Sequence, residues 1–189
     1  MEKIGKPQNN YWENFYKNNS LTKKPSDFCK YVCETFDLQE LTVLDLCSGN
    51  GRDSYYLASQ SKKVVAVDQA VKIKNLHNLV CFKEKISNFF LNNKGDDFDL
   101  TYCRFGIHSI EEEEEDIILQ NSRFIAFEFR SDKDDSYKQD HYRRKINGNK
   151  FLTKIIHFGF EVCYYKEAKN LAVFKEQDPY IIRIIAKKR

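Results

Sequence analysis

The stretch from Val43 to Ser54 constrains the fold of this chain more than any other. It reads VLDLCSGNGRDS, so an apolar strand leads into a short loop with two glycines, and the loop opens a helix. A second apolar run follows that helix and ends in an acid, Asp68. In a parallel sheet this order brings loop and acid to the same edge, where the acid can hold a ribose diol and the glycines let a ligand approach the backbone. The stretch therefore predicts a nucleoside pocket.

Strand-like and helix-like segments alternate from residue 41 onwards, which predicts an α/β fold with a mostly parallel sheet. We expect helices at 52–60, 86–92, 111–120 and 148–158. We expect strands at 41–46, 63–68, 78–82, 97–103, 122–129, 160–166 and 180–187. No helical segment separates the last two strands, so we expect them to form a terminal antiparallel hairpin at the sheet edge.

The length of 189 residues and the apolar fraction of 41% predict one domain with a single core. Residues 41–189 are expected to form a Rossmann-like core, and residues 1–40 a helical lid or cap segment. Within the latter, Trp12 and Tyr16 are four apart and share a face if helical. Ser26 is the expected N-cap of a second helix.

Six cysteines occur without a CxxC pair, which indicates buried free thiols in a reducing compartment. The first 20 residues do not resemble a signal peptide, and no apolar run approaches the ~20 residues of a membrane helix. The net charge of +3 argues against a dedicated nucleic-acid binder. We therefore expect a cytoplasmic protein without membrane insertion.

The glycine loop has the spacing Asp45-x-Cys47-x-Gly49-x-Gly51, which differs from the GxGxxG of dinucleotide enzymes. It resembles the first motif of the class I S-adenosylmethionine-dependent methyltransferases, Asp-x-Gly-x-Gly-x-Gly. The likeness covers most of the chain, with Asp68 as the ribose acid, the apolar strand at 98–103 and the closing hairpin. It implies a seven-stranded sheet with helices on both faces and S-adenosylmethionine as cofactor.

Matched position by position, the family motif implies that Asp45, Gly49 and Gly51 line the amino-acid end of the cofactor, and that Asp68 accepts hydrogen bonds from the ribose. Further candidate cofactor contacts are Trp12, Tyr16, Cys47, Arg52, Gln69, Ile86 and Arg104, of which the two aromatic residues could pack against the sulfonium cation. The aromatic residues Trp12 and Tyr16 fit a core or lid role equally well. Asp53, which follows Arg52, is either a helix cap or a further cofactor contact.

This sequence departs from the family in two places. Cys47 stands where the first glycine is usual, and its side chain limits the freedom of the backbone. The acid that often follows the third strand, near the adenine amine, is absent, because Lys85, Ile86 and Ser87 stand there. Adenine recognition is therefore expected to use backbone groups near Ile86.

The acceptor side is less distinctive. The segment after the fourth strand lacks the Asn/Asp/Ser-Pro-Pro-Tyr/Phe signature of amino methyltransferases, and it carries His108, a candidate general base or a structural histidine. The polar segment 130–147 follows the fifth strand. It contains four candidate acceptor contacts, which are Arg130, His141, Arg143 and Arg144. His141 is also a candidate catalytic group. The alternative is a solvated charged loop.

The acidic run from Glu111 to Asp116 is expected to be a solvated helix start, where acids meet the positive end of the helix dipole. It lacks the histidine partners of a metal site, and we expect no metal.

These observations favour a methyltransferase for a small polar, possibly anionic acceptor. The loop sequence GNGRDS at 49–54 and the sequence DPYIIR at 178–183 resemble small methyltransferases of surface-glycan biosynthesis. Oxygen methylation of a sugar, sugar nucleotide or phosphorylated metabolite therefore fits best. One alternative is an RNA or protein methyltransferase that uses residues 130–150 as a basic surface. Another is a non-catalytic cofactor-binding or partner protein.

Overall fold

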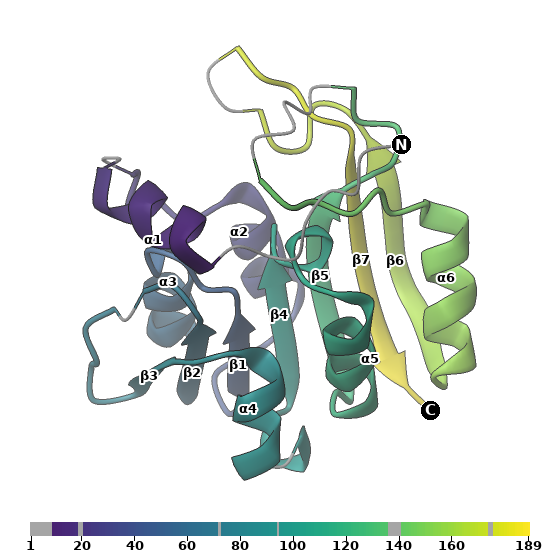
Figure 1. The fold of residues 1–189 in the computed structure, drawn as a ribbon. Helices are drawn as coiled ribbons and strands as arrows, with labels where there is room; N and C mark the ends of the chain where they lie inside the picture. The colour runs from purple at the N-terminus through teal and green to yellow at the C-terminus, as the bar shows by residue number, and fades with distance from the viewer. Residues whose placement is uncertain (1–8, 19–20, 72, 94, 136–140, 174–175) are drawn as a thin grey trace.

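The computed structural model describes residues 9–18, 21–71, 73–93, 95–135, 141–173 and 176–189. Within them, seven strands form one sheet in the order β3-β2-β1-β4-β5-β7-β6 (Figure 1). Neighbouring strands are parallel except at β7, which runs antiparallel to both β5 and β6. The strands are β1 (Thr42–Leu46), β2 (Lys63–Asp68), β3 (Leu79–Lys83), β4 (Leu100–Arg104), β5 (Phe124–Arg130), β6 (Phe160–Ala168) and β7 (Ile181–Lys188).

The predicted fold class is confirmed, including the terminal antiparallel hairpin. The hairpin does not simply extend the sheet, because its last strand, β7, lies between β5 and β6 and leaves β6 at the edge. The apolar run of β7 explains this position, since its first six residues are buried. In β6 only Phe160 is buried, and the residues after it are partly or fully exposed, as expected of an edge strand.

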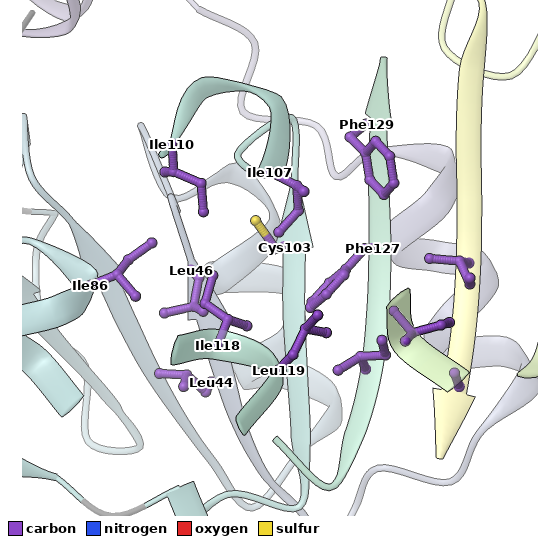
Figure 2. Packing of buried hydrophobic residues seen from close by; sticks show 14 of the residues in the cluster. Leu44, Leu46, Ile86, Cys103, Ile107, Ile110, Ile118, Leu119, Phe127 and Phe129 are labelled. Atoms are coloured by element: carbon purple, nitrogen blue, oxygen red, sulfur yellow. The ribbon is translucent and has the colours of Figure 1, made fainter. Parts of the chain in front are cut away.

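Helices cover both faces of the sheet (Figure 1). On one face, α4 (Ile86–Asn92), α5 (Glu112–Gln120) and α6 (Gly148–His157) pack into one apolar cluster (Figure 2). On the other, α2 (Asp27–Thr35) and α3 (Arg52–Gln60) pack into a second cluster. Successive strand residues alternate between the clusters: Leu44 and Leu46 of β1 belong to the first, and Val43 to the second. Burial on both faces explains the continuous apolar runs of the central strands.

The remaining helical elements lie in the N-terminal segment and in two turns. Helix α1 (Asn9–Asn18) lies above the carboxyl ends of the central strands (Figure 1). Two short 3₁₀ helices, η1 (Gly95–Asp97) and η2 (Ile107–Ser109), flank β4. Ser26 caps α2 as predicted, since its Oγ accepts the N–H of Cys29 at 3.0 Å. None of the helices described here is long and apolar enough to cross a membrane.

Candidate functional site

The loop between β1 and α3 adopts left-handed backbone conformations at three positions. Gly49 has φ +56°, Gly51 has φ +75°, and Cys47, despite its side chain, has φ +56°. A Cβ on Gly49 would lie 2.4 Å from the hydroxyl oxygen of Tyr16, so the close approach of Tyr16 requires glycine there. Cys47 thus adopts the conformation that a glycine would take more easily, at a cost of about 1 kcal/mol.

Asp68, at the carboxyl end of β2, is fixed by backbone amides. Its Oδ2 accepts the N–H of Gly49 at 2.9 Å, and its Oδ1 accepts those of Ala70 at 2.8 Å and Val71 at 3.2 Å. Burial raises the pKa of Asp68, while these three hydrogen bonds counteract the rise. Since a carboxylate offers about four acceptor positions, one remains for a ligand among the described contacts.

Two other acids of this region face the interior. Asp45 is buried and accepts the hydroxyl of Ser54 at 2.6 Å, and burial raises its pKa well above the usual value. Asp53 accepts the backbone N–H and the hydroxyl of Ser26 at 2.7 and 2.8 Å, and the hydroxyl of Tyr102 at 2.9 Å. Asp53 therefore neither caps its own helix nor faces the loop; it ties the start of α2 to α3.

A cavity of about 120 Å³ lies at the carboxyl edge of β1, β2 and β4. Several predicted cofactor residues line it together: Trp12, Tyr16, Cys47, Asp68, Gln69, Ile86 and Arg104. The other predicted contacts, Asp45, Gly49, Gly51 and Arg52, are not part of the lining. A larger, more open groove lies at the opposite edge of the sheet and contains none of the predicted site residues.

Helix α1 and the segment after β5 meet above this cavity. The ring of His141 stacks on Tyr11 at 4.6 Å between centroids and meets Trp12 edge-to-face at 5.0 Å. Glu13 forms an ion pair with Lys83 of β3 at 2.7 Å. Tyr16 is partly buried over the glycine loop, and its partial removal from solvent raises its pKa. In the described part of residues 1–40, Trp12 and Tyr16 of α1 line the cavity, whereas α2 packs into the core; the lid role of this segment stays a prediction.

A buried carboxylate organises the ends of β4, β5 and β7. Glu128 is fully buried and accepts from Arg104 Nε at 2.7 Å and from Arg183 Nε at 2.6 Å. The guanidinium of Arg104 also lies 4.4 Å from the centre of the Phe105 ring, with that of Arg130 at 5.7 Å. Phe105 has φ +56°, an uncommon conformation for a residue with a bulky side chain.

The predicted acceptor residues have different surroundings. His108 is buried, and its Nδ1 accepts the backbone N–H of Arg130 at 3.2 Å. Burial and the nearby arginines hold its pKa well below the usual value, so it is neutral. Arg144 donates to the carbonyls of Ile107 at 2.9 Å and Ile110 at 2.7 Å. These contacts favour structural roles for His108 and Arg144, whose functional roles stay predictions.

Arg130 and Arg143 approach the same carboxylate. Arg130 Nη1 donates to Asp134 Oδ2 at 2.6 Å, and Arg143 Nη1 lies 3.8 Å from that oxygen. The guanidinium groups are mostly buried, so the described part of this segment is not simply a solvated loop. Residues 136–140 of the predicted loop lie outside the described residues.

The expectation of a solvated helix start at the acidic run holds only in part. Glu112 and Glu113 are exposed, but Glu115 is buried and pairs with Arg144 and with Lys154, the latter at 2.7 Å. Glu114 lines the cavity. Two residues of the run are therefore turned inwards.

Sequence reasoning missed several residues of the cavity wall: Val67, Glu84, Lys85, Phe105, Gly106, Ser109, Ile110 and Glu114. Four of these residues could have been predicted from their position after a strand. Glu84 and Lys85 directly follow β3, and Phe105 and Gly106 directly follow β4. Ser109 and Glu114 depend on how the chain turns after β4 and where α5 packs, and neither has a local signal in the sequence.

Comparisons with known proteins bear on the fold. No protein-family model matches the sequence, and no curated protein matches it significantly. Solved structures do match. A Burkholderia thailandensis 1,6-didemethyltoxoflavin-N1-methyltransferase with bound S-adenosylhomocysteine gives a TM-score of 0.66 at 13% identity, over 86% of this chain and 79% of that one.

An S-adenosylmethionine-dependent methyltransferase from Anabaena variabilis gives a TM-score of 0.64 at 15% identity, over 100% of this chain and 99% of that one. The cyclase SpnF also matches, with a TM-score of 0.63 at 11% identity, over 85% of this chain and 79% of that one. At such identities the likeness concerns the fold alone. With its strand order and its antiparallel β7, this chain has the Rossmann-like fold of the class I S-adenosylmethionine-dependent methyltransferases.

Proposed function

We propose that this protein is an S-adenosylmethionine-dependent methyltransferase for a small, polar acceptor. The observation that carries the proposal is the cavity at the carboxyl edge, where Cys47, Asp68 and Arg104 meet from the ends of three adjacent strands. In open α/β sheets, ligands bind in this crevice. The cofactor would supply an electrophilic methyl group on a sulfonium centre, for in-line transfer to the acceptor.

The residues present fit a nucleoside cofactor. Cys47 of the left-handed glycine loop, the carboxylate of Asp68 with one acceptor position left, and the apolar side chain of Ile86 surround one space. The cavity of about 120 Å³ is smaller than the ~300–1,000 Å³ of typical ligand pockets. Tyr16 and Trp12 reduce it from the side of α1, so we expect α1 to shift outwards when the cofactor enters.

The acceptor class follows from the charges beside the cavity. Arg104 lines it, and the guanidinium groups of Arg104 and Arg130 lie 4.4 and 5.7 Å from the centre of the Phe105 ring. Fixed guanidinium groups suit a carboxylate or phosphate on the acceptor. We therefore propose a polar or anionic acceptor methylated on oxygen, such as a sugar, sugar nucleotide or phosphorylated metabolite of glycan biosynthesis, with Arg143 as a further contact.

The proposed base for a neutral hydroxyl is His141 in preference to His108. His141 lies beside Trp12, which lines the cavity, and is only partly buried. His108 already accepts a backbone N–H at Nδ1, and its depressed pKa makes it a weak proton acceptor. Most of the rate would come from positioning the acceptor against the methyl group.

Two measurements test the proposal. Calorimetric titration with S-adenosylhomocysteine is expected to show saturable 1:1 binding, and a screen of nucleotide sugars and phosphorylated metabolites with methyl-labelled cofactor is expected to identify a labelled product. Absence of cofactor binding would refute the proposal altogether. Binding without transfer to any acceptor would leave a cofactor-binding protein instead of an enzyme.

A further inference from the structure

Helix α5 brings a carboxylate to the place where the sequence lacks one. Glu84, directly after β3, lines the cavity, but residues 85–87 contain no acid, and Glu114 of α5 lines the cavity beside Ile86. Its Oε1 lies within hydrogen-bonding distance of the backbone nitrogen of Ser87, at 3.4 Å, and of the Ser87 hydroxyl, at 3.3 Å. These bonds hold Glu114 against the start of α4 and leave Oε2 without a hydrogen bond among the described residues.

A second polar residue lines the same cavity. Ser109 is 8% exposed and lines the cavity from the end of η2. Its backbone N–H donates to the carbonyl of Gly106 at 2.7 Å, which fixes the turn, but its Oγ has no hydrogen-bond partner within the described part of the chain. Buried hydroxyl groups normally have partners, so this one indicates that a ligand completes its hydrogen bonding.

The cavity wall also includes apolar side chains. Ile86 of α4 and Ile110, directly after η2, are each 5% exposed and both line the cavity. Figure 2 shows them on separate elements beside Leu46 of β1. A flat apolar ring with polar atoms on its rim would fit this arrangement, with Asp68 of β2 available to a sugar attached to it.

We propose that Glu114 and Ser109 recognise the adenine base of the cofactor, with the Glu114 carboxylate accepting a hydrogen bond from the exocyclic amine and the Ser109 hydroxyl bonding to a ring nitrogen. The inference rests on the proposed function and adds to it a source of base specificity. The carboxylate beside the base then comes from α5, and not from residues 85–87 after β3. An exocyclic carbonyl in place of the amine would face the carboxylate and be rejected.

The test compares two ligands that differ at this one group, S-adenosyl-L-homocysteine and S-inosyl-L-homocysteine. By calorimetry, the wild-type protein is expected to bind the adenosyl ligand about 30-fold more tightly. In Glu114→Gln the ratio is expected to fall to about threefold or less, because an amide can donate to the inosyl carbonyl. The neighbouring exposed residue supplies the matched control, since Glu113→Gln is expected to keep the wild-type ratio.

A wild-type ratio in Glu114→Gln would overturn the assignment while leaving cofactor binding intact. If the wild-type protein bound neither ligand, the proposed function itself would fail. Ser87→Ala separates the structural contact of Glu114 from its recognition role, because it removes the Ser87 hydroxyl and keeps the carboxylate. Its ligand ratio is expected to stay near that of the wild type, and a ratio as low as that of Glu114→Gln would mean that Glu114 acts only by holding α4.

Ser109→Ala tests the second group. Because the hydroxyl has no partner in the described protein, its removal is expected to leave the melting temperature of the ligand-free protein unchanged or higher. Affinity for S-adenosylhomocysteine is expected to fall about fivefold. A lower melting temperature with unchanged affinity would show that Ser109 is structural and would remove it from the site.

Discussion

The carboxyl edge of the sheet has two halves that are held in place by different contacts. In the half formed by β1 and β2, backbone amides of the loops hold the end of the strand. Asp68, for example, accepts three backbone N–H groups. In the half formed by β4 and β5, ion pairs between side chains hold the strand ends together. Glu128, for example, pairs with Arg104 and Arg183. Asp68 of the first half therefore keeps an acceptor position for a ligand, whereas the ion pairs of Glu128 in the second half stabilise the fold.

The comparison explains why roles for the cations after β5 are harder to assign from the sequence than roles for the glycine loop. Amide contacts follow from the local sequence, since Gly49 and Ala70 lie close to the strand ends that they join. Arg144 instead binds carbonyls more than 30 residues away along the chain. A charge count along the segment cannot separate an arginine with such contacts from one that faces the acceptor.

The largest expected effect concerns the ion pairs of the second half. Glu128→Gln is expected to lower the free energy of unfolding by about 3 kcal/mol, because two guanidinium groups would share a buried neutral partner. Urea denaturation measures it. Glu161→Gln is the control, since Glu161 pairs with Arg189 at an exposed site, and its effect should stay below about 1 kcal/mol. Equal effects of the two variants would contradict the structural role assigned to Glu128.

The next effect concerns ligand binding in the first half. Asp68→Ala is expected to weaken the binding of S-adenosylhomocysteine about 30-fold, because a charged hydrogen-bond acceptor for the ribose is lost. Calorimetry measures the affinity, and circular dichroism checks that the variant is folded at the assay temperature. Asp37→Ala, at an exposed position outside the cavity lining, should bind as the wild type does. Unchanged affinity in Asp68→Ala would remove Asp68 from the site.

Arg143 and Arg144 allow a comparison of neighbours. Arg144→Ala is expected to lower the free energy of unfolding by about 2 kcal/mol, because two carbonyls and Glu115 lose their donor. Arg143→Ala is expected instead to raise the KM for the acceptor found in the transfer screen, with little change in the affinity for S-adenosylhomocysteine. If Arg143→Ala left the acceptor kinetics unchanged, the proposed acceptor contact would be wrong.

The smallest effect concerns Cys47. Cys47→Gly is expected to raise the free energy of unfolding by up to ~1 kcal/mol relative to Cys47→Ala, because only glycine relieves the left-handed backbone at φ +56°. Both variants remove the thiol, so their difference isolates the backbone contribution. Thermal and urea denaturation measure it, and a more stable alanine variant would contradict the interpretation.

Much of the fold was predictable because it depends on patterns within short windows. The apolar runs of β1 and β2 and the predicted helices at 52–60 and 86–92 agree with the observed elements to within a residue. The place of β7 between β5 and β6 has no such pattern, since it depends on which strands pair. Asp53 shows the same limit in the site, because its partners Ser26 and Tyr102 are far away in the sequence.

The placement of Tyr16 over Gly49 has a consequence for the rate of binding. If the cavity admits cofactor only when α1 moves away, the apparent dissociation constant equals the intrinsic one divided by the fraction of open molecules. Weakening the contacts of α1, such as the ion pair of Glu13 with Lys83, would then increase that fraction and the association rate together. Substitutions on the face of α1 away from the cavity would thus change the association rate of the cofactor without contacting it.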